Sequence, residues 1–265
     1  MPNVLALDFD GVICDSAGEC LYSAYNTYAA VRGLQDAASV TDIRSDWYDT
    51  FYQIRPYIRD GKDYFVILYF LENEISVESQ TQFDDQSAAV MQEVCSLAEV
   101  ENKDDLEKHF QDSRRAIRAK DEAAWFDMNP LYDRMREGLD SLGPGFEGVY
   151  ITTSKPTDAA TKILYHNGIE IPEPQILGKD KVKKTVAKNS QMEAVASAAN
   201  IELSEILFLD DQVSHLTAAQ KIGVQCFVAT WGYNTDEQVE EAVQAGIPLL
   251  SEDDISEWTG AVKSK

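Results

Sequence analysis

Short apolar runs alternate with amphipathic segments along the second half of the chain. The apolar runs are residues 148–154, 174–177, 205–211 and 225–232, and the amphipathic segments are residues 157–168, 190–200, 214–223 and 236–246. This alternation predicts β-strands that alternate with α-helices, which is typical of a parallel sheet covered by helices. The opening run, residues 4–8, has the same character, so we expect it to join that sheet.

Residues 16–142 show a different pattern, in which apolar side chains recur at helical spacing. The clearest helical segments are residues 21–33, 63–75, 86–98, 105–119 and 132–142. Few strand signals lie among them, and we find no internal repeat. The sequence therefore predicts a doubly wound α/β domain, residues 1–15 and 143–265, with an all-helical insertion, residues 16–142, after the first strand.

The aromatic side chains of the insertion also follow helical spacing, which predicts a packed core and not a surface that stacks on bases. They include Tyr22, Tyr25, Tyr28, Trp47, Tyr48 and Phe51. Residues 143–148, GPGFEG, match a GxGxxG pattern. A dinucleotide fingerprint must follow a strand and open a helix, whereas this segment follows a helix and precedes a strand, so we interpret it as a turn.

The charge of the chain limits the choice of partners. Its 265 residues include 46 Asp and Glu against 23 Lys and Arg, a formal net charge of -23. Such a surface repels nucleic acids and anionic membranes, so we expect neither as a partner. No apolar run approaches the roughly 20 residues of a membrane span, and because the first strand begins close to Met1 we expect no leader peptide.

The four cysteines are scattered and form no CxxC pair, which argues against a zinc cluster or a dithiol redox motif. They are Cys14, Cys20, Cys95 and Cys226. We expect reduced thiols in the cytoplasm or another reducing compartment, a plastid included.

Polar residues follow the apolar runs at the places where strands are expected to end. They are Asp8 and Asp10, then Thr152, Thr153 and Ser154, then Asp210 and Asp211, together with Lys188 at the start of a helix. Ligands of open α/β sheets bind beyond the carboxyl ends of the strands, so these residues are the candidates for chemistry. Several carboxylates in one crevice repel one another unless a cation lies among them, and oxygen ligands beside a phosphate favour Mg2+. Taken singly, each residue is also compatible with a helix cap, a turn or a solvated surface.

Three motifs together resemble the haloacid dehalogenase-like hydrolase superfamily. They are DFDGV at residues 8–12, ITTSKP at residues 151–156 and FLDDQ at residues 208–212. The helical insertion after the first strand resembles the cap of one branch of that superfamily. Residues 153–169 and 206–234 are similar to its phosphoglycolate phosphatase-like members in particular.

The resemblance implies a role for each matching residue. Asp8 matches the nucleophile that forms an aspartyl-phosphate, and Asp10 matches the general acid and base. Thr153 matches the phosphate-binding hydroxyl, and we expect Gly11 and Ser154 beside it at the phosphate.

A lysine and a metal site complete the set that the resemblance implies. Lys188 matches the lysine that offsets negative charge, although four lysines of residues 179–184 compete with it: Lys179, Lys181, Lys183 and Lys184. Asp210 and Asp211 match the acidic motif that binds Mg2+ together with the Asp8 carboxylate and the Asp10 main chain. Relatives often carry another acid where this chain has His215. Either the adjacent Asp210 and Asp211 supply the needed carboxylates, or the departure weakens metal binding or changes the metal preferred. The alternative is that His215 lies on the helix surface, or that it contacts a residue that binds the metal without binding the metal itself.

These expectations define a Mg2+-dependent phosphohydrolase that acts on a small phosphorylated metabolite. Asp10 favours phosphoryl transfer over dehalogenation, because a halide leaves without a proton. A sugar-phosphate mutase and a catalytically silent binding protein of the same fold are the alternatives, and the oligomeric state is left open. In the insertion, we expect Arg55 or Arg59 to bind a second anionic group of the substrate. The alternative is an ion pair within the insertion, with Asp46, Asp49 or Asp60.

Overall fold

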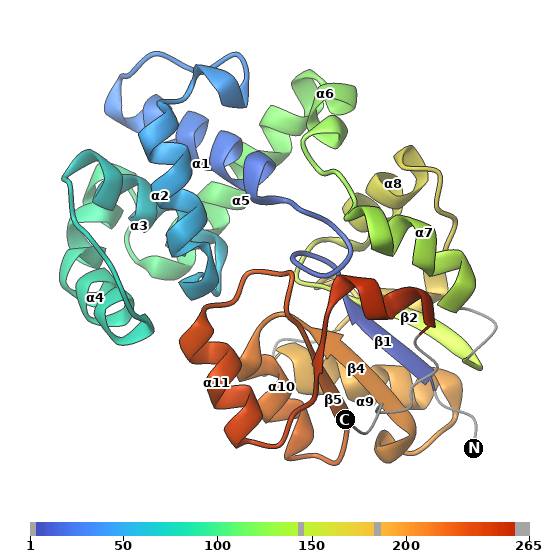
Figure 1. The fold of residues 1–265 in the computed structure, drawn as a ribbon. Helices are drawn as coiled ribbons and strands as arrows, with labels where there is room; N and C mark the ends of the chain where they lie inside the picture. Colours follow the sequence, from blue (N-terminus) through green and yellow to red (C-terminus); the bar gives the residue numbers. More distant parts are fainter. Residues whose placement is uncertain (1–3, 143–145, 183–186, 258–265) are drawn as a thin grey trace. The chain divides into compact units, whose positions relative to one another are not determined.

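A computed structural model describes residues 4–142, 146–182 and 187–257. The chain divides into two compact units, one of Met1–Asp15 with Pro130–Lys265 and one of Ser16–Asn129. The first unit contains the sheet and the second is helical (Figure 1).

The first unit is built on a six-stranded sheet in the order β3-β2-β1-β4-β5-β6, and every paired neighbour is parallel. The strands are β1 (Val4–Asp8), β2 (Gly148–Thr152), β3 (Ile176–Leu177), β4 (Ile206–Asp210), β5 (Gln225–Ala229) and β6 (Leu249–Leu250). This confirms the predicted doubly wound α/β fold. The edge strand β6 was not predicted.

Strand β1 lies at the centre of the sheet and all five of its residues are buried. The chain runs outward from β1 through β2 to β3 and then returns to β4 on the other side of β1. This reversal of direction opens a crevice between the carboxyl ends of the two strands. Leu7 pairs with Leu209, so Asp8 and Asp210, the last residues of β1 and β4, end at about the same level.

Helices follow the strands as the alternation predicts. They are α7 (Asp133–Leu142), α8 (Thr157–His166), α9 (Ala187–Ala199), α10 (Val213–Gln220) and α11 (Asp236–Gln244), with short 3-10 turns η4 (Glu173–Gln175), η5 (Leu203–Glu205) and η6 (Glu252–Glu257). Helix α9 packs on β1 and β2, and α10 packs on β4 and β5. Met192 of α9 and Leu216 of α10 are buried with Phe208 of β4 in one apolar cluster.

The α/β unit resumes at Pro130, earlier than the expected boundary at residue 143. The two chain segments that join the units pair with each other, since Asp15 N–H donates to Pro130 O (2.9 Å) and Tyr132 N–H donates to Ile13 O (3.0 Å). Helix α7 then packs on η6, where Arg134 N–H donates to Glu252 (2.9 Å). Its amphipathic pattern is the same as that of the insertion helices, so the sequence alone assigned it to the insertion.

The second unit, all of whose residues 16–129 the structure describes, contains helices and no strand. The helices are α1 (Ala17–Arg32), α2 (Ser45–Ile54), α3 (Gly61–Glu72), α4 (Gln80–Leu97), α5 (Lys103–Lys120) and α6 (Glu122–Asp127), with η1 (Val40–Asp42) and η2 (Arg55–Tyr57). The predicted helical character is confirmed. Helices α2 and α6 were not among the predicted segments.

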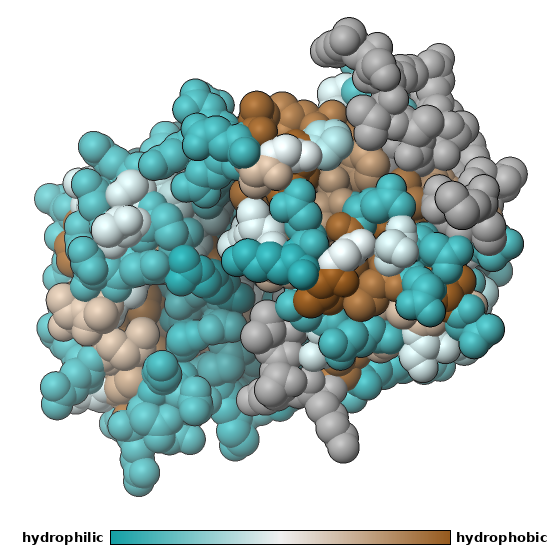
Figure 2. Space-filling view, turned by 90° about the horizontal axis from the view of Figure 1, so that it is seen from below, coloured by the Kyte–Doolittle hydropathy of each residue, from teal (hydrophilic) through white to brown (hydrophobic). Residues whose placement is uncertain are grey.

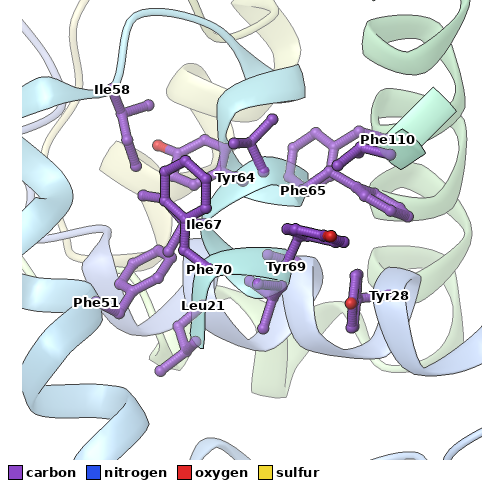
Figure 3. Close-up of a cluster of buried hydrophobic side chains, with 14 of the residues drawn as sticks. Leu21, Tyr28, Phe51, Ile58, Tyr64, Phe65, Ile67, Tyr69, Phe70 and Phe110 are labelled. Carbon is purple, nitrogen blue, oxygen red and sulfur yellow. The ribbon is translucent and has the colours of Figure 1, made fainter. Parts of the chain in front are cut away.

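An aromatic core holds the helical unit together around α3 (Figure 3). Phe65 of α3 contacts the ring of Tyr28 on α1 at 5.3 Å between centroids, and Tyr64 stacks on Phe110 of α5 at 5.4 Å. Aromatic pairs of this kind add stability beyond the area that they bury. The predicted aromatic core is confirmed: Tyr28 and Phe51 are buried, and the others pack against them partly exposed, namely Tyr22, Tyr25, Trp47 and Tyr48.

A buried ion pair ties α1 to α5 and α6 within the helical unit. The Glu19 side chain is fully buried and is paired with Arg114 of α5. Trp125 Nε1 of α6 and Ser23 Oγ of α1 also donate to Glu19 Oε1, at 2.9 and 2.6 Å. These donors compensate the cost of removing the carboxylate from water.

Most of the surface seen in Figure 2 is hydrophilic, as the excess of acidic residues leads one to expect, with smaller hydrophobic patches between the polar areas. Among the described residues, no helix combines the length and the apolar character needed to cross a membrane.

Candidate active site

The candidate active site lies in the α/β unit at the carboxyl ends of β1 and β4. Asp8 is 7% exposed and Asp210 is fully buried. Lys188, in the first turn of α9, places its Nζ 2.7 Å from Asp8 Oδ1 and 3.4 Å from Asp210 Oδ2. The same ammonium group donates to Thr152 O at 3.0 Å. One buried lysine therefore bridges the two buried carboxylates.

Two of the four lysines that competed with Lys188 in the sequence belong to the described residues. Lys181 pairs with Glu173 at 3.0 Å, and Lys179 N–H donates to the main-chain oxygen of Lys155. Lys183 and Lys184 lie outside the described residues.

Burial and neighbouring charges set the protonation of this cluster. Burial, with a smaller contribution from the nearby Asp210, raises the pKa of Asp8 to about 6 against the lowering influence of Lys188. Burial also acts to raise the pKa of Asp210, but Lys188 and His215 outweigh it and hold that pKa below its ordinary value. Burial acts to lower the pKa of Lys188, yet Asp8 and Asp210 keep it above its ordinary value. Lys188 thus stays positively charged. Of the two aspartates, Asp210 loses its proton at the lower pH.

A second buried lysine holds Asp10. Lys155 Nζ lies 2.5 Å from Asp10 Oδ1, and its side chain is only 3% exposed. Lys155 follows the motif residues Thr153 and Ser154, so the ITTSKP match was the signal that it belongs to the site. Sequence analysis gave it no role.

Thr153 is buried beside this pair. Its Oγ1 accepts a hydrogen bond from Lys155 N–H (3.0 Å), and its main-chain oxygen accepts one from Gln191 Nε2 (2.9 Å). Gln191 also donates to Leu177 O (2.8 Å), so it links the residue after β2 to the end of β3. Ser154, the next residue, is exposed.

Asp211 is held from a direction that the sequence did not reveal. Tyr233 N–H donates to Asp211 Oδ2 (2.7 Å), and the Tyr233 hydroxyl donates to Asp15 (2.6 Å). Trp231 Nε1 donates to Val12 O (3.0 Å), so a hydrogen bond joins the segment after β5 to the segment after β1. The available signal in the sequence was residues 230–234, TWGYN, which follow the apolar run of β5. They include no acidic residue, so sequence analysis did not count them among the candidates for chemistry.

His215 approaches the acidic centre from the first turn of α10. Its Nδ1 lies 3.0 Å from Asp210 Oδ2, and its side chain is 37% exposed. Ligand atoms of Asp8, Asp210 and His215 all lie within 4.8 Å of one another.

The donor set suits a divalent cation. Asp8, Asp10, Asp210 and Asp211 carry four carboxylates against the two ammonium groups of Lys155 and Lys188, a formal charge of -2 when all are ionised. Two of these carboxylates converge while buried, an arrangement that a cation would stabilise. Carboxylate oxygens are ligands that Mg2+ accepts.

The two arginines predicted to bind substrate belong to the helical unit. Arg55 is buried with its guanidinium 5.7 Å from the Tyr64 ring centroid, and Arg59 pairs with Asp84 at 3.2 Å. This ion pair lies within the insertion, but Asp84 is not one of the three aspartates considered from the sequence. Two of those three have other partners: Asp46 pairs with Arg44, and Asp60 pairs with Lys62. A role for Arg55 and Arg59 in substrate binding stays a prediction.

Gly11 makes the close approach of the β1 and β5 segments to Asp211 possible. Its φ is +83°, and a Cβ at this position would collide with Asp211 Oδ2 and lie 2.9 Å from Tyr233 Cδ2. We expect Gly11→Ala to lower the free energy of unfolding by roughly 3 kcal/mol, as the sum of backbone strain and overpacking. We also expect it to reduce activity, because Asp211 must move.

Gly168 offers a matched control for this change. Its φ is +80°, and no heavy atom of the described residues lies within 4 Å of the place that a Cβ would take. Gly168→Ala therefore introduces strain without a collision. Denaturant unfolding of both variants separates the two effects, with about 1–2 kcal/mol expected for the control. Equal losses in the two variants would show that the collision at Gly11 is relieved at no cost.

The strand order, the acidic centre at the end of the central strand and the helical insertion directly after that strand define a phosphatase-type hydrolase. The chain belongs to the haloacid dehalogenase-like hydrolase family, whose family model matches residues 2–223. This confirms the resemblance inferred from the motifs.

Relatives and solved structures agree with this assignment. The chain is 22% identical to a phosphoglycolate phosphatase of Vibrio vulnificus over 237 residues, 89% of this chain and 87% of the relative. It is 28% identical to a phosphoglycolate phosphatase of Pectobacterium atrosepticum over 110 residues, 42% of this chain and 47% of the relative. The fold is similar to that of a predicted phosphoglycolate phosphatase from Haemophilus somnus, with a TM-score of 0.63, 17% identity and 97% of each chain covered. It is also similar to a Thermotoga maritima protein assigned as a β-phosphoglucomutase, with a TM-score of 0.54, 13% identity and coverage of 96% of this chain and 97% of the other.

Proposed function

We propose that the protein is a Mg2+-dependent phosphohydrolase that cleaves a small phosphorylated metabolite through an aspartyl-phosphate on Asp8. The observation that carries this proposal is the buried Asp8 carboxyl group 2.7 Å from Lys188, with Asp10 two residues further along the chain. A carboxylate beside a fixed cation is suited to attack an anionic phosphate, because the cation offsets the repulsion between them.

The reaction takes place in two steps. In the first, an Asp8 oxygen bonds to phosphorus and the bond from phosphorus to the leaving oxygen breaks, while Asp10 gives that oxygen a proton. In the second, Asp10 takes a proton from water as the water oxygen bonds to phosphorus, and the bond between phosphorus and Asp8 breaks. Inorganic phosphate leaves and Asp8 is restored.

The remaining residues bind and orient the phosphoryl group. Lys188 neutralises charge on the nucleophile and the phosphate, Thr153 and Ser154 supply hydrogen bonds, and Gly11 lets the main chain turn sharply beside the phosphate. Mg2+ would be held by Asp8, Asp210 and Asp211 with the main-chain oxygen of Asp10. When bound, it supplies positive charge that lowers the repulsion between carboxylate and phosphate.

Phosphoglycolate is the first substrate to test, because the curated relatives from Vibrio vulnificus and Pectobacterium atrosepticum are phosphoglycolate phosphatases. Its carboxylate is the kind of second anionic group that we propose Arg55 or Arg59 to bind. The Thermotoga maritima protein suggests phosphosugar mutase activity as the alternative, and that likeness concerns the fold.

The test is phosphate release from phosphoglycolate and from p-nitrophenyl phosphate, with Mg2+ and with EDTA. We expect Mg2+-dependent release from at least one compound and none with EDTA. Conversion of β-glucose 1-phosphate to glucose 6-phosphate without phosphate release would support the mutase instead. Binding of phosphate esters without any turnover would support a silent binding protein.

A further inference from the structure

His215 occupies a position from which it can reach a cation at the acidic centre. Its 37% exposed side chain lies at the edge of the site, whereas Asp210, which it contacts, is fully buried. The first turn of α10 fixes its main chain, because His215 N–H donates to Gln212 O at 2.9 Å. Gln212 N–H in turn donates to Asp210 Oδ1 at 2.8 Å, which directs the other oxygen, Oδ2, toward His215 and Lys188.

The distances within this group suit a set of metal ligands. Adjacent ligands of an octahedral cation, each about 2.1 Å from the ion, lie about 3 Å apart. The Nδ1 atom of His215 and the Oδ2 atom of Asp210 are 3.0 Å apart. One ligand atom from each of Asp8, Asp210 and His215 lies within 4.8 Å of the other two, so the three side chains are close enough to gather around one ion.

We propose that His215 Nδ1 is a direct ligand of the divalent cation, together with the carboxylates of Asp8 and Asp210, and that the site therefore binds Mn2+ or Co2+ more tightly than it binds the Mg2+ of the proposed reaction. Imidazole nitrogen binds first-row transition ions well, whereas Mg2+ favours oxygen ligands and retains its water. The proposal rests on the metal centre of the proposed function. The competing arrangement is a histidine that only donates a hydrogen bond to Asp210.

Pulsed electron paramagnetic resonance of the Mn2+-loaded protein distinguishes the two arrangements. With histidine labelled by 15N, a nitrogen bound directly to Mn2+ gives a hyperfine coupling that a hydrogen-bonded nitrogen does not. We expect this coupling in the wild type and in the control His166→Ala, whose histidine is exposed on α8, and we expect its loss in His215→Ala. Absence of the coupling in the wild type would overturn the proposal.

Metal affinities measured by titration calorimetry provide a second readout. His215→Ala should weaken Mn2+ binding by more than the roughly tenfold to hundredfold that is typical of losing a residue that only supports a ligand, and should weaken Mg2+ binding much less. His215→Asp should reduce the preference for Mn2+, because it restores an oxygen ligand. Equal weakening of both ions in His215→Ala would contradict the proposal.

Neither readout depends on turnover, so the two proposals fail separately. A protein that shows the nitrogen coupling but releases no phosphate would contradict the proposed function and leave the ligand assignment intact. A phosphatase without the coupling would do the reverse. Thermal unfolding of the metal-free variants checks that the partly exposed position tolerates the changes.

Discussion

Asp8→Asn is expected to lower kcat/KM for phosphate release on the order of 10^4-fold, which corresponds to about 5 kcal/mol of transition-state stabilisation. The amide has nearly the shape of the carboxyl group but cannot form an aspartyl-phosphate. The fold should not suffer, because burial raises the pKa of Asp8 to about 6 and thus disfavours its charged form. Lys188 also keeps Asp210 as a partner at 3.4 Å. We therefore expect loss of activity at unchanged or slightly higher thermal stability.

Steady-state kinetics with p-nitrophenyl phosphate and circular dichroism measure both quantities. The matched control is Asp85→Asn on α4 (Gln80–Leu97), where the side chain is exposed and full activity is expected. Substantial activity in Asp8→Asn would rule out Asp8 as the nucleophile.

Asp10→Asn offers a complementary observation in the same assay. p-Nitrophenolate leaves without a proton, so the first step proceeds, while the second lacks its base. Intact-protein mass spectrometry after a rapid acid quench should then show one added phosphoryl group in Asp10→Asn and none in Asp8→Asn.

Lys188→Met is expected to impair both stability and catalysis. Lys188 is 4% exposed at the side chain and is the ammonium group that contacts Asp8 and Asp210 together. Removing one member of a buried ion pair typically costs about 3–5 kcal/mol, because a charge is left buried without compensation. Methionine fills most of the space, so the loss reports charge more than volume.

The pH dependence of activity should change in the same variant. Lys188 lowers the pKa of Asp8, which burial holds at about 6. Without this ammonium group, Asp8 retains its proton to higher pH, so the reactive carboxylate forms later and the acid limb of the kcat/KM profile moves upward. Denaturant unfolding and pH–rate profiles test both effects, with Lys221→Met at an exposed position as the control. An acid limb that stays in place would show that Lys188 does not set the charge of the nucleophile.

Local patterns determined which residues end the central strands. The apolar runs of β1 and β4 are long enough to predict strands, and Asp8 and Asp210 follow from where those runs stop. The motif around Asp8 and the helical spacing of the insertion indicated the family and the two units. Each of these features depends on neighbours within a few residues, so a single sequence reveals it.

The tertiary structure decided which of these residues meet. Lys188 reaches Asp8 across 180 positions of the chain, and Lys155 reaches Asp10 across 145. Tyr233, 22 positions after Asp211, holds that carboxylate through its main-chain N–H, a contact that does not depend on side-chain type. The return of the chain to the α/β unit at Pro130 is likewise marked by hydrogen bonds between two distant segments. Such contacts arise when parallel strands bring their carboxyl ends to one edge of a sheet, and the spacing of apolar residues along a chain carries no record of which partners will be brought together there.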